Sequence, residues 1–126
     1  MRAVDTNVLV RLITRDDPAQ SAAAEAYIAR GVWVSLLALA ETSWVLSKLY
    51  GVAASRLAAV IEMMLEHAHL SLQDPDVVAR ALVLFRSRQA PEFSDCLLLE
   101  MARKAGHLPL GTFDKRLAWL DDVERL

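Results

Sequence analysis

Short apolar stretches alternate with longer amphipathic segments along the chain, and this alternation limits the folds that it can adopt. Extended stretches are expected at 2–4, 32–35, 69–72, 108–112 and 123–126, and helices at 6–14, 18–30, 36–50, 55–67, 75–88, 95–106 and 114–120. Strands that alternate with helices pair in parallel, and the helices cover the sheet. The sequence therefore predicts an α/β fold with a central, mostly parallel sheet flanked by helices.

Helix boundaries are indicated by residues that favour helix ends. Asp17 followed by Pro18 indicates an N-terminus, because Asp caps helices and Pro is tolerated at the first helical position. Ser55 is expected to cap a later helix, and Ser94 or Asp95 is expected to cap the helix at 95–106. These signals favour a chain that is folded throughout, with no linker or repeat.

Composition indicates one domain that keeps some apolar surface outside its core. A chain of 126 residues fits a single domain over 1–126 and needs no disulfide or metal to support its core. Its hydrophobic fraction is 55%, above the usual range of roughly 45–50%. That excess favours a helix-rich interior together with apolar surface that a partner buries. Trp33, Trp44 and Trp119 are expected in the core or at an interface.

The single cysteine and the absence of long apolar runs predict a cytoplasmic protein. Cys96 stands in an apolar run and is expected in the core, and its lack of a partner favours a reducing compartment. Asp5 interrupts the N-terminal apolar stretch too early for a signal peptide. No apolar run approaches the roughly 20 residues that span a bilayer, so no membrane association is expected.

The net charge of −2 excludes a basic nucleic-acid coat, so any nucleic-acid contact must be local. Eleven of the fourteen basic residues are Arg, the better bidentate phosphate ligand, although a compositional bias explains this equally well. Candidates for backbone or partner contacts are Arg11, Arg15, Arg86 and Arg88. A solvated helix face is the simpler interpretation of each.

Four acids occupy positions that a fold does not require for its own sake: Asp5, Glu41, Asp95 and Asp114. Asp5 and Asp114 follow expected strands, and Asp95 stands at an expected helix start. Glu41 lies within a helix whose neighbouring positions at helical spacing are Leu37, Ala38, Trp44 and Val45. Ligands of parallel sheets bind outside the carboxyl ends of the strands, so all four acids can face one crevice.

Each acid also has a simpler structural explanation. Asp5 can cap the helix that starts at Thr6, Asp95 and Asp114 can be cap or turn residues, and Glu41 can form a salt bridge. Four such coincidences at one end of a sheet favour function instead. Carboxylates gathered together repel unless a cation neutralises them, and hard divalent cations take oxygen ligands. The pattern predicts a metal-dependent phosphodiesterase centre, with supporting roles for Asn7, Ser94 and Thr112.

Four segments together resemble the PIN-domain nucleases and, within them, the VapC toxins of bacterial toxin–antitoxin pairs. They are Val-Asp-Thr-Asn-Val-Leu-Val (4–10), Ala-Glu-Thr-Ser-Trp-Val-Leu (40–46), Phe-Ser-Asp-Cys-Leu (93–97) and Thr-Phe-Asp (112–114). The resemblance covers nearly the whole chain in the family's motif order. Ser94 stands where Ala is often found, which does not affect the acids.

The resemblance implies a three-layer α/β/α fold and a metal site made by Asp5, Glu41, Asp95 and Asp114. Asn7 and Thr112 match the family's supporting positions. The implied activity is Mg²⁺- or Mn²⁺-dependent endonucleolytic cleavage of RNA, often tRNA or ribosomal RNA. The implied partners are a second copy of the chain, in a homodimer, and a small VapB-like antitoxin whose C-terminal segment covers the site.

The expected function is therefore a toxin endoribonuclease that inhibits translation, with a catalytically silent PIN-like or receiver-like binding domain as the alternative. A receiver-like domain would carry adjacent acids after the first strand, but Asp5 is followed by Thr6. A dehalogenase-like phosphatase would carry Asp-x-Asp, where this chain has Asn7. Replacement of Asp5 or Asp95 by Asn is expected to abolish cleavage while the fold is kept.

Overall fold

The computed structural model describes residues 1–87 and 91–126. In chain order the elements are β1 (Arg2–Ala3), α1 (Thr6–Thr14), α2 (Pro18–Ile28), β2 (Val32–Val34), α3 (Leu36–Lys48), α4 (Ala54–Glu66), β3 (Leu70–Leu72), α5 (Pro75–Arg86), α6 (Phe93–Ala105), β4 (Leu110–Thr112), η1 (Leu117–Trp119) and β5 (Val123–Arg125). They fall into two compact units, Met1–Pro75 and Asp76–Leu126. Every described strand pairing is parallel, which confirms the predicted α/β class.

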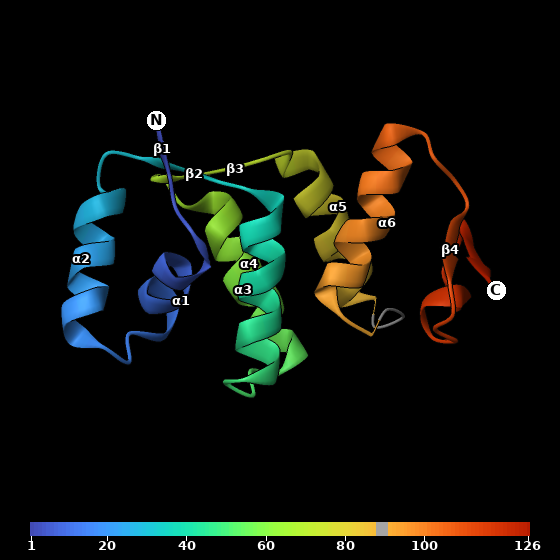
Figure 1. Ribbon diagram of the computed structural model, residues 1–126, viewed down its shortest axis with the longest axis horizontal. Coiled ribbons are helices and arrows are strands. Elements are labelled where there is room, and N and C mark those ends of the chain that lie inside the picture. The colour runs from blue at the N-terminus through green and yellow to red at the C-terminus, as the bar shows by residue number, and fades with distance from the viewer. Residues whose placement is uncertain (88–90) are drawn as a thin grey trace. The chain divides into compact units, whose positions relative to one another are not determined.

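The first unit is a three-stranded parallel sheet with four helices. The strand order is β1-β2-β3, and the register places Ala3 beside Trp33 and Val34 beside Leu72. Helix α1 lies between α2 and α3, and α4 contacts both α3 and β3 (Figure 1). The apolar stripe of each helix turns inward, so that side chains such as Leu9, Leu39, Leu46, Ile61 and Met64 are fully buried. These contacts fix the carboxyl end of β1 beside the start of α1.

Helix starts in this unit follow the expected capping chemistry at one helix and depart from it at another. The Asp17 side chain accepts the Gln20 backbone N–H at 3.0 Å, and Pro18 is the first residue of α2, as predicted. The prediction that Ser55 caps the next helix is wrong. Helix α4 begins at Ala54, and no side chain caps it. Packing of its buried stripe, and not a capping residue, sets where this helix begins.

The second unit is an antiparallel helix pair followed by two short parallel strands. Phe85 near the end of α5 meets Phe93 at the start of α6 edge to face, with ring centroids 5.7 Å apart. At the opposite ends of the two helices, the Lys104 Nζ lies 3.2 Å from an Asp76 carboxylate oxygen. β4 and β5 pair in register from Leu110–Val123 to Thr112–Arg125, and β5 lies where the last extended stretch was predicted.

The start of α6 differs from the prediction that Ser94 or Asp95 caps it. The helix begins at Phe93, with Glu92 in the capping position and no side-chain cap bond. Phe93 is buried against Phe85, and this packing starts the helix before the polar residues that follow. Ser94 and Asp95 therefore lie inside the first turn, and the capping explanation of Asp95 no longer holds.

The tryptophans and the cysteine behave differently from one another. Trp33, Trp44 and Trp119 are all exposed, so the prediction of a core role for them is wrong and an interface role stays a prediction. Cys96 is fully buried, as expected, and this burial raises the pKa of its thiol to about 12. In the part of the chain that the structure describes, no helix combines the length and the apolar character needed to cross a membrane.

Candidate functional site

Asp5 follows β1 and is the capping residue of α1. Its backbone is extended, and its Oδ1 accepts the Val8 backbone N–H at 3.2 Å. The structural explanation for this acid is therefore confirmed, because the carboxylate satisfies one of the free N–H groups at the helix start. The bond uses Oδ1, so capping does not account for Oδ2. Asp5 is exposed, and its carboxylate can serve both the helix and a ligand.

Glu41 lies at the same end of α1, because the residue after Asp5 binds it. The Thr6 hydroxyl donates to the Glu41 Oε2 at 3.1 Å, which joins α1 to α3. The expected apolar neighbours are present but do not bury this acid, since Leu37 is 69% exposed and Trp44 51%. Within the described residues of the first unit no cation pairs with Glu41. The salt-bridge explanation for this acid therefore has no support there.

Asp95 and Asp114 form the acidic pair of the second unit. Asp95 is partly buried in the first turn of α6, and burial is the largest cause that raises the pKa of its carboxyl. The charges of Asp114 and Glu92 raise it further. An acid that is desolvated beside like charges holds its proton more tightly, and a cation placed there reverses the effect. Among the acids of the proposed site, Asp95 is therefore the one whose ionised form a nearby cation would stabilise most.

The carboxylate of Asp114 is held by the turn that follows β4. Its Oδ1 accepts the backbone N–H groups of Arg116 at 2.7 Å and Leu117 at 3.2 Å. The turn explanation for this acid is thus confirmed, although the helical turn predicted over 114–120 is limited to a 3₁₀ helix at Leu117–Trp119. The Thr112 hydroxyl accepts the Asp114 backbone N–H at 3.0 Å, which fits the supporting position predicted for Thr112.

The other two supporting residues have different surroundings. Asn7 lines an apolar groove between α1 and α2, of about 340 Å³, together with residues that include Arg11 and Tyr27. Ser94 is partly buried directly before Asp95. No described hydrogen bond links either side chain to an acid of the proposed site. A role for Asn7 or Ser94 toward a metal or a water stays a prediction.

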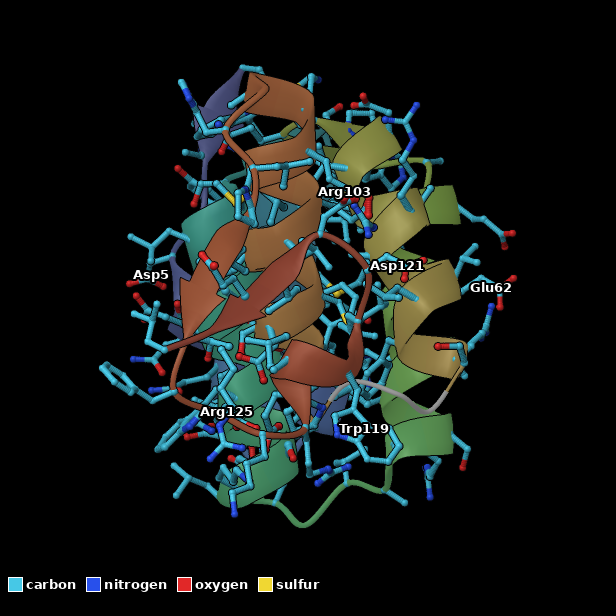
Figure 2. The ribbon with its side chains drawn as sticks, turned by 90° about the vertical axis from the view of Figure 1, so that its right-hand side faces the viewer. Asp5, Glu62, Arg103, Trp119, Asp121 and Arg125 are labelled. Atoms are coloured by element: carbon cyan, nitrogen blue, oxygen red, sulfur yellow. The ribbon has the colours of Figure 1, made fainter. Side chains whose placement is uncertain are left out.

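A buried acid and its partner were missed in the sequence. Glu100 is only 6% exposed, and its Oε2 accepts from the Arg103 guanidinium at 3.0 Å. Arg103 also donates to the Asp122 carboxylate at 3.3 Å and to the Asp121 carbonyl oxygen (Figure 2). An acid inside the apolar run of α6 with Arg three residues later was the available signal. This pair supports the fold of the second unit, so its acid is already neutralised.

The arginines suggested as nucleic-acid contacts are mostly engaged within the protein. The Arg11 guanidinium binds Gln20, Asp16 and Tyr50, joining α1 to the residues that follow it and to the end of α3. Arg15 pairs with Glu25. Arg86, the last residue of α5, also has a partner. Arg88 lies outside the described residues.

The donor set fits a hard divalent cation. Each unit places two of the four acids near each other and offers carboxylate oxygens, the ligands that Mg²⁺ and Mn²⁺ prefer. Among residues 1–87 and 91–126, no three His, Cys, Asp or Glu side chains are grouped so that they could hold a metal ion.

One family model matches almost the whole chain. The model of the PIN domain matches residues 2–123. The chain belongs to the PIN domain family. This membership and the parallel strands agree with the predicted three-layer α/β/α fold. PIN domains are generally nucleases, so the coarse activity is that of a hydrolase, and PIN domains typically use divalent metals. The comparisons with curated proteins and with solved structures gave no match.

Proposed function

We propose that this PIN domain is a divalent-metal-dependent endoribonuclease and the toxin of a VapBC-type toxin–antitoxin pair. The observation that carries the proposal is the pair of Asp95 and Asp114, where burial and like charge raise the pKa of Asp95. Groups with perturbed pKa values concentrate at functional sites. Family membership supplies the activity class. The VapC-like order of the four acidic motifs favours RNA as the substrate.

In the proposed site Asp5, Glu41, Asp95 and Asp114 hold Mg²⁺ or Mn²⁺ within one domain, 1–126. When bound, the cation supplies Lewis acidity, which lowers the pKa of water and offsets charge that develops on the scissile phosphate. The chain's own hydrogen bonds orient the ligands. Thr6 holds Glu41, and two backbone N–H groups hold Asp114. Such support fixes ligand orientation before a substrate arrives.

The proposed substrate is a tRNA or ribosomal RNA in the cytoplasm, and cutting it inhibits translation. The proposed partners are a second copy of the chain and a VapB-like antitoxin. Exposed apolar side chains on α3 support a protein partner, because monomers seldom leave large apolar groups together in water. Leu37 and Trp44 of α3, and Leu49 directly after it, are all more than half exposed.

The test compares wild type with Glu41→Gln after induced expression in a bacterial host. Gln keeps an oxygen that accepts from Thr6 but removes the charge that holds a cation. We expect growth arrest and a discrete set of new RNA 5′ ends with wild type, and neither with the variant. Glu25→Gln, which alters an acid of the surface pair with Arg15, is the matched control and should behave as wild type.

A second arm uses purified protein and total RNA. Cleavage should require Mg²⁺ or Mn²⁺ and stop when a chelator removes it. Cutting that persists in Glu41→Gln, or in chelator, contradicts the assignment of the acids. Folded wild-type protein that neither arrests growth nor cuts RNA would support the catalytically silent alternative.

A further inference from the structure

Two large aromatic side chains are presented to solvent on either side of Asp114. Phe113 directly precedes this acid and is 80% exposed, and Trp119 ends the following 3₁₀ helix and is 85% exposed. They are the most exposed aromatic side chains in the described part of the chain. Burial of aromatic rings stabilises a folded protein, and the exposed rings of Phe113 and Trp119 do not contribute in this way to the fold of this unit.

Three cations lie in or beside the same segment. Lys115 and Arg116 follow Asp114 and are exposed, and Arg125 lies opposite Thr112 in the β4–β5 register. Among the described residues none of the three forms an ion pair, whereas Arg103 of the same unit holds two acids. Their charge is therefore available to a ligand.

The nearby acids do not cancel this charge. Asp122 is paired with Arg103. Glu124 precedes Arg125 in β5, and neighbouring residues of a strand point to opposite faces, so Glu124 lies on the other face of the strand. The face that carries Arg125 and Thr112 thus leads directly to Asp114.

The segment that carries these side chains is held in one conformation. Leu117 and Leu120 are buried and anchor it, while the Asp114 carboxylate fixes its first turn. β4 pairs with β5 beside it. Rings and cations on a fixed segment lose little conformational entropy when they bind.

We propose that residues 113–119 and Arg125 form a platform for an unpaired RNA strand. Phe113 and Trp119 stack on bases, and Lys115, Arg116 and Arg125 contact phosphates. The platform rests on the proposed ribonuclease function and assigns the residues that hold the strand beside Asp114. A base offers its face to a ring only where it is unpaired, so the RNA is cut in a loop or another single-stranded stretch and not in a duplex.

The experiment measures binding of labelled RNA by fluorescence anisotropy with the full chain carrying Asp95→Asn, which prevents cutting. The probes are a hairpin with a large loop and a fully paired duplex. Phe113→Leu and Trp119→Leu keep apolar bulk but remove the ring, and each should weaken loop binding by roughly tenfold. Phe113→Trp should retain it. Trp33→Leu, an exposed Trp in β2 of the first unit, is the matched control.

The cations have a separate readout. Lys115→Ala with Arg116→Ala should lower the slope of log affinity against log salt by about two, if each contacts one phosphate. Arg30→Ala with Arg56→Ala removes the same charge from the first unit and should leave the slope unchanged. Thermal unfolding of all variants verifies that they are folded, and little change is expected because the replaced side chains are exposed.

The outcomes separate the platform from the activity. Loop affinity that is unchanged in both Leu variants, or that falls equally for loop and duplex, overturns the platform even if wild type cuts RNA. In that case the exposed rings would be assigned to binding a protein partner and not RNA. If the Asp95→Asn chain binds no RNA and wild type cuts none, the proposed function and the platform both fall.

Discussion

The two acidic pairs of this PIN domain differ in the surroundings of one member, Asp95. In the first unit Asp5 accepts a backbone N–H and Glu41 accepts a hydroxyl, so each carboxylate has a donor. In the second unit Asp95 is partly buried beside Asp114 and Glu92, and its pKa is raised. The first pair is compatible with the fold alone. In the second pair Asp114 also has backbone donors, so the cost that positive charge would remove lies at Asp95.

The second unit also contains its own counter-example. Glu100 is more deeply buried than Asp95, yet Arg103 neutralises it at 3.0 Å. The same helix thus supplies a cation for one acid and none for the other among the described residues. A structural buried carboxylate has a neutralising cation within the chain, and one that lacks such a cation is the better candidate for an external ligand.

The largest expected effect tests that distinction at the site. Asp95→Asn or Asp114→Asn should reduce RNA cleavage by more than about a hundredfold, because even residues that only support metal ligands contribute roughly 10–100-fold. The initial rate on a labelled RNA measures this. Asp76→Asn, which removes the exposed pair with Lys104, is the control and should cut normally. Cleavage by either site variant within about tenfold of wild type would place the metal elsewhere.

The next effect concerns stability and the buried pair. Arg103→Ala should lower the free energy of unfolding by about 2–3 kcal/mol, because it leaves Glu100 buried without its cation. Lys104→Ala removes the neighbouring surface pair and should cost less than about 1 kcal/mol. Urea denaturation of both variants measures the difference. Equal losses would show that burial does not separate these two ion pairs.

A smaller effect separates capping from catalysis at Asp5. Asp5→Ala should cost about 1 kcal/mol of stability, because the Val8 N–H loses its acceptor. Asp5→Asn keeps an acceptor and should be nearly neutral for stability. Both should lose cleavage, since both lose the charge. If the Asp5→Asn variant still cuts RNA, Asp5 acts only as a helix cap.

The smallest effect is a gain in stability at the second pair. Without divalent metal at neutral pH, Asp95→Asn should raise Tm by on the order of a few degrees, since it removes a desolvated charge beside Asp114. The raised pKa means that the cost of ionised Asp95 is full above that pKa and absent below the ordinary value of 3.8. The gain should therefore fade as pH drops through this interval. Mg²⁺ should stabilise wild type more than the variant.

Much of this fold could be predicted because its helices have strong local signals. Helix α1 has the predicted bounds, and Asp17-Pro18 marks the start of α2. The starts of α4 and α6 were misplaced, since tertiary packing sets them there. Phe93 packs on Phe85, a contact that no local pattern contains. The predicted Asp95 cap failed for this reason.

The candidate site was predictable in its residue types and not in its surroundings. The acids were visible because each interrupts or ends an apolar run. Exposure of Trp119 and Phe113 was not predictable, because hydrophobicity indicates what a side chain favours and not whether an element is available to cover it. The partner of Glu100 was missed because the ion pair depends on the side-chain conformation of Arg103, which directs its guanidinium toward Glu100 on α6.

The buried thiol beside Asp95 can be used to measure local opening of this domain. Cys96 is the only cysteine of the chain, its Sγ is shielded, and its pKa of about 12 keeps it in the unreactive thiol form. A thiol-specific dye can therefore label only molecules in which the start of α6 has transiently opened. The labelling rate under native conditions measures the free energy of that opening. The opening is measured one residue from Asp95, an acid on which the proposed chemistry depends.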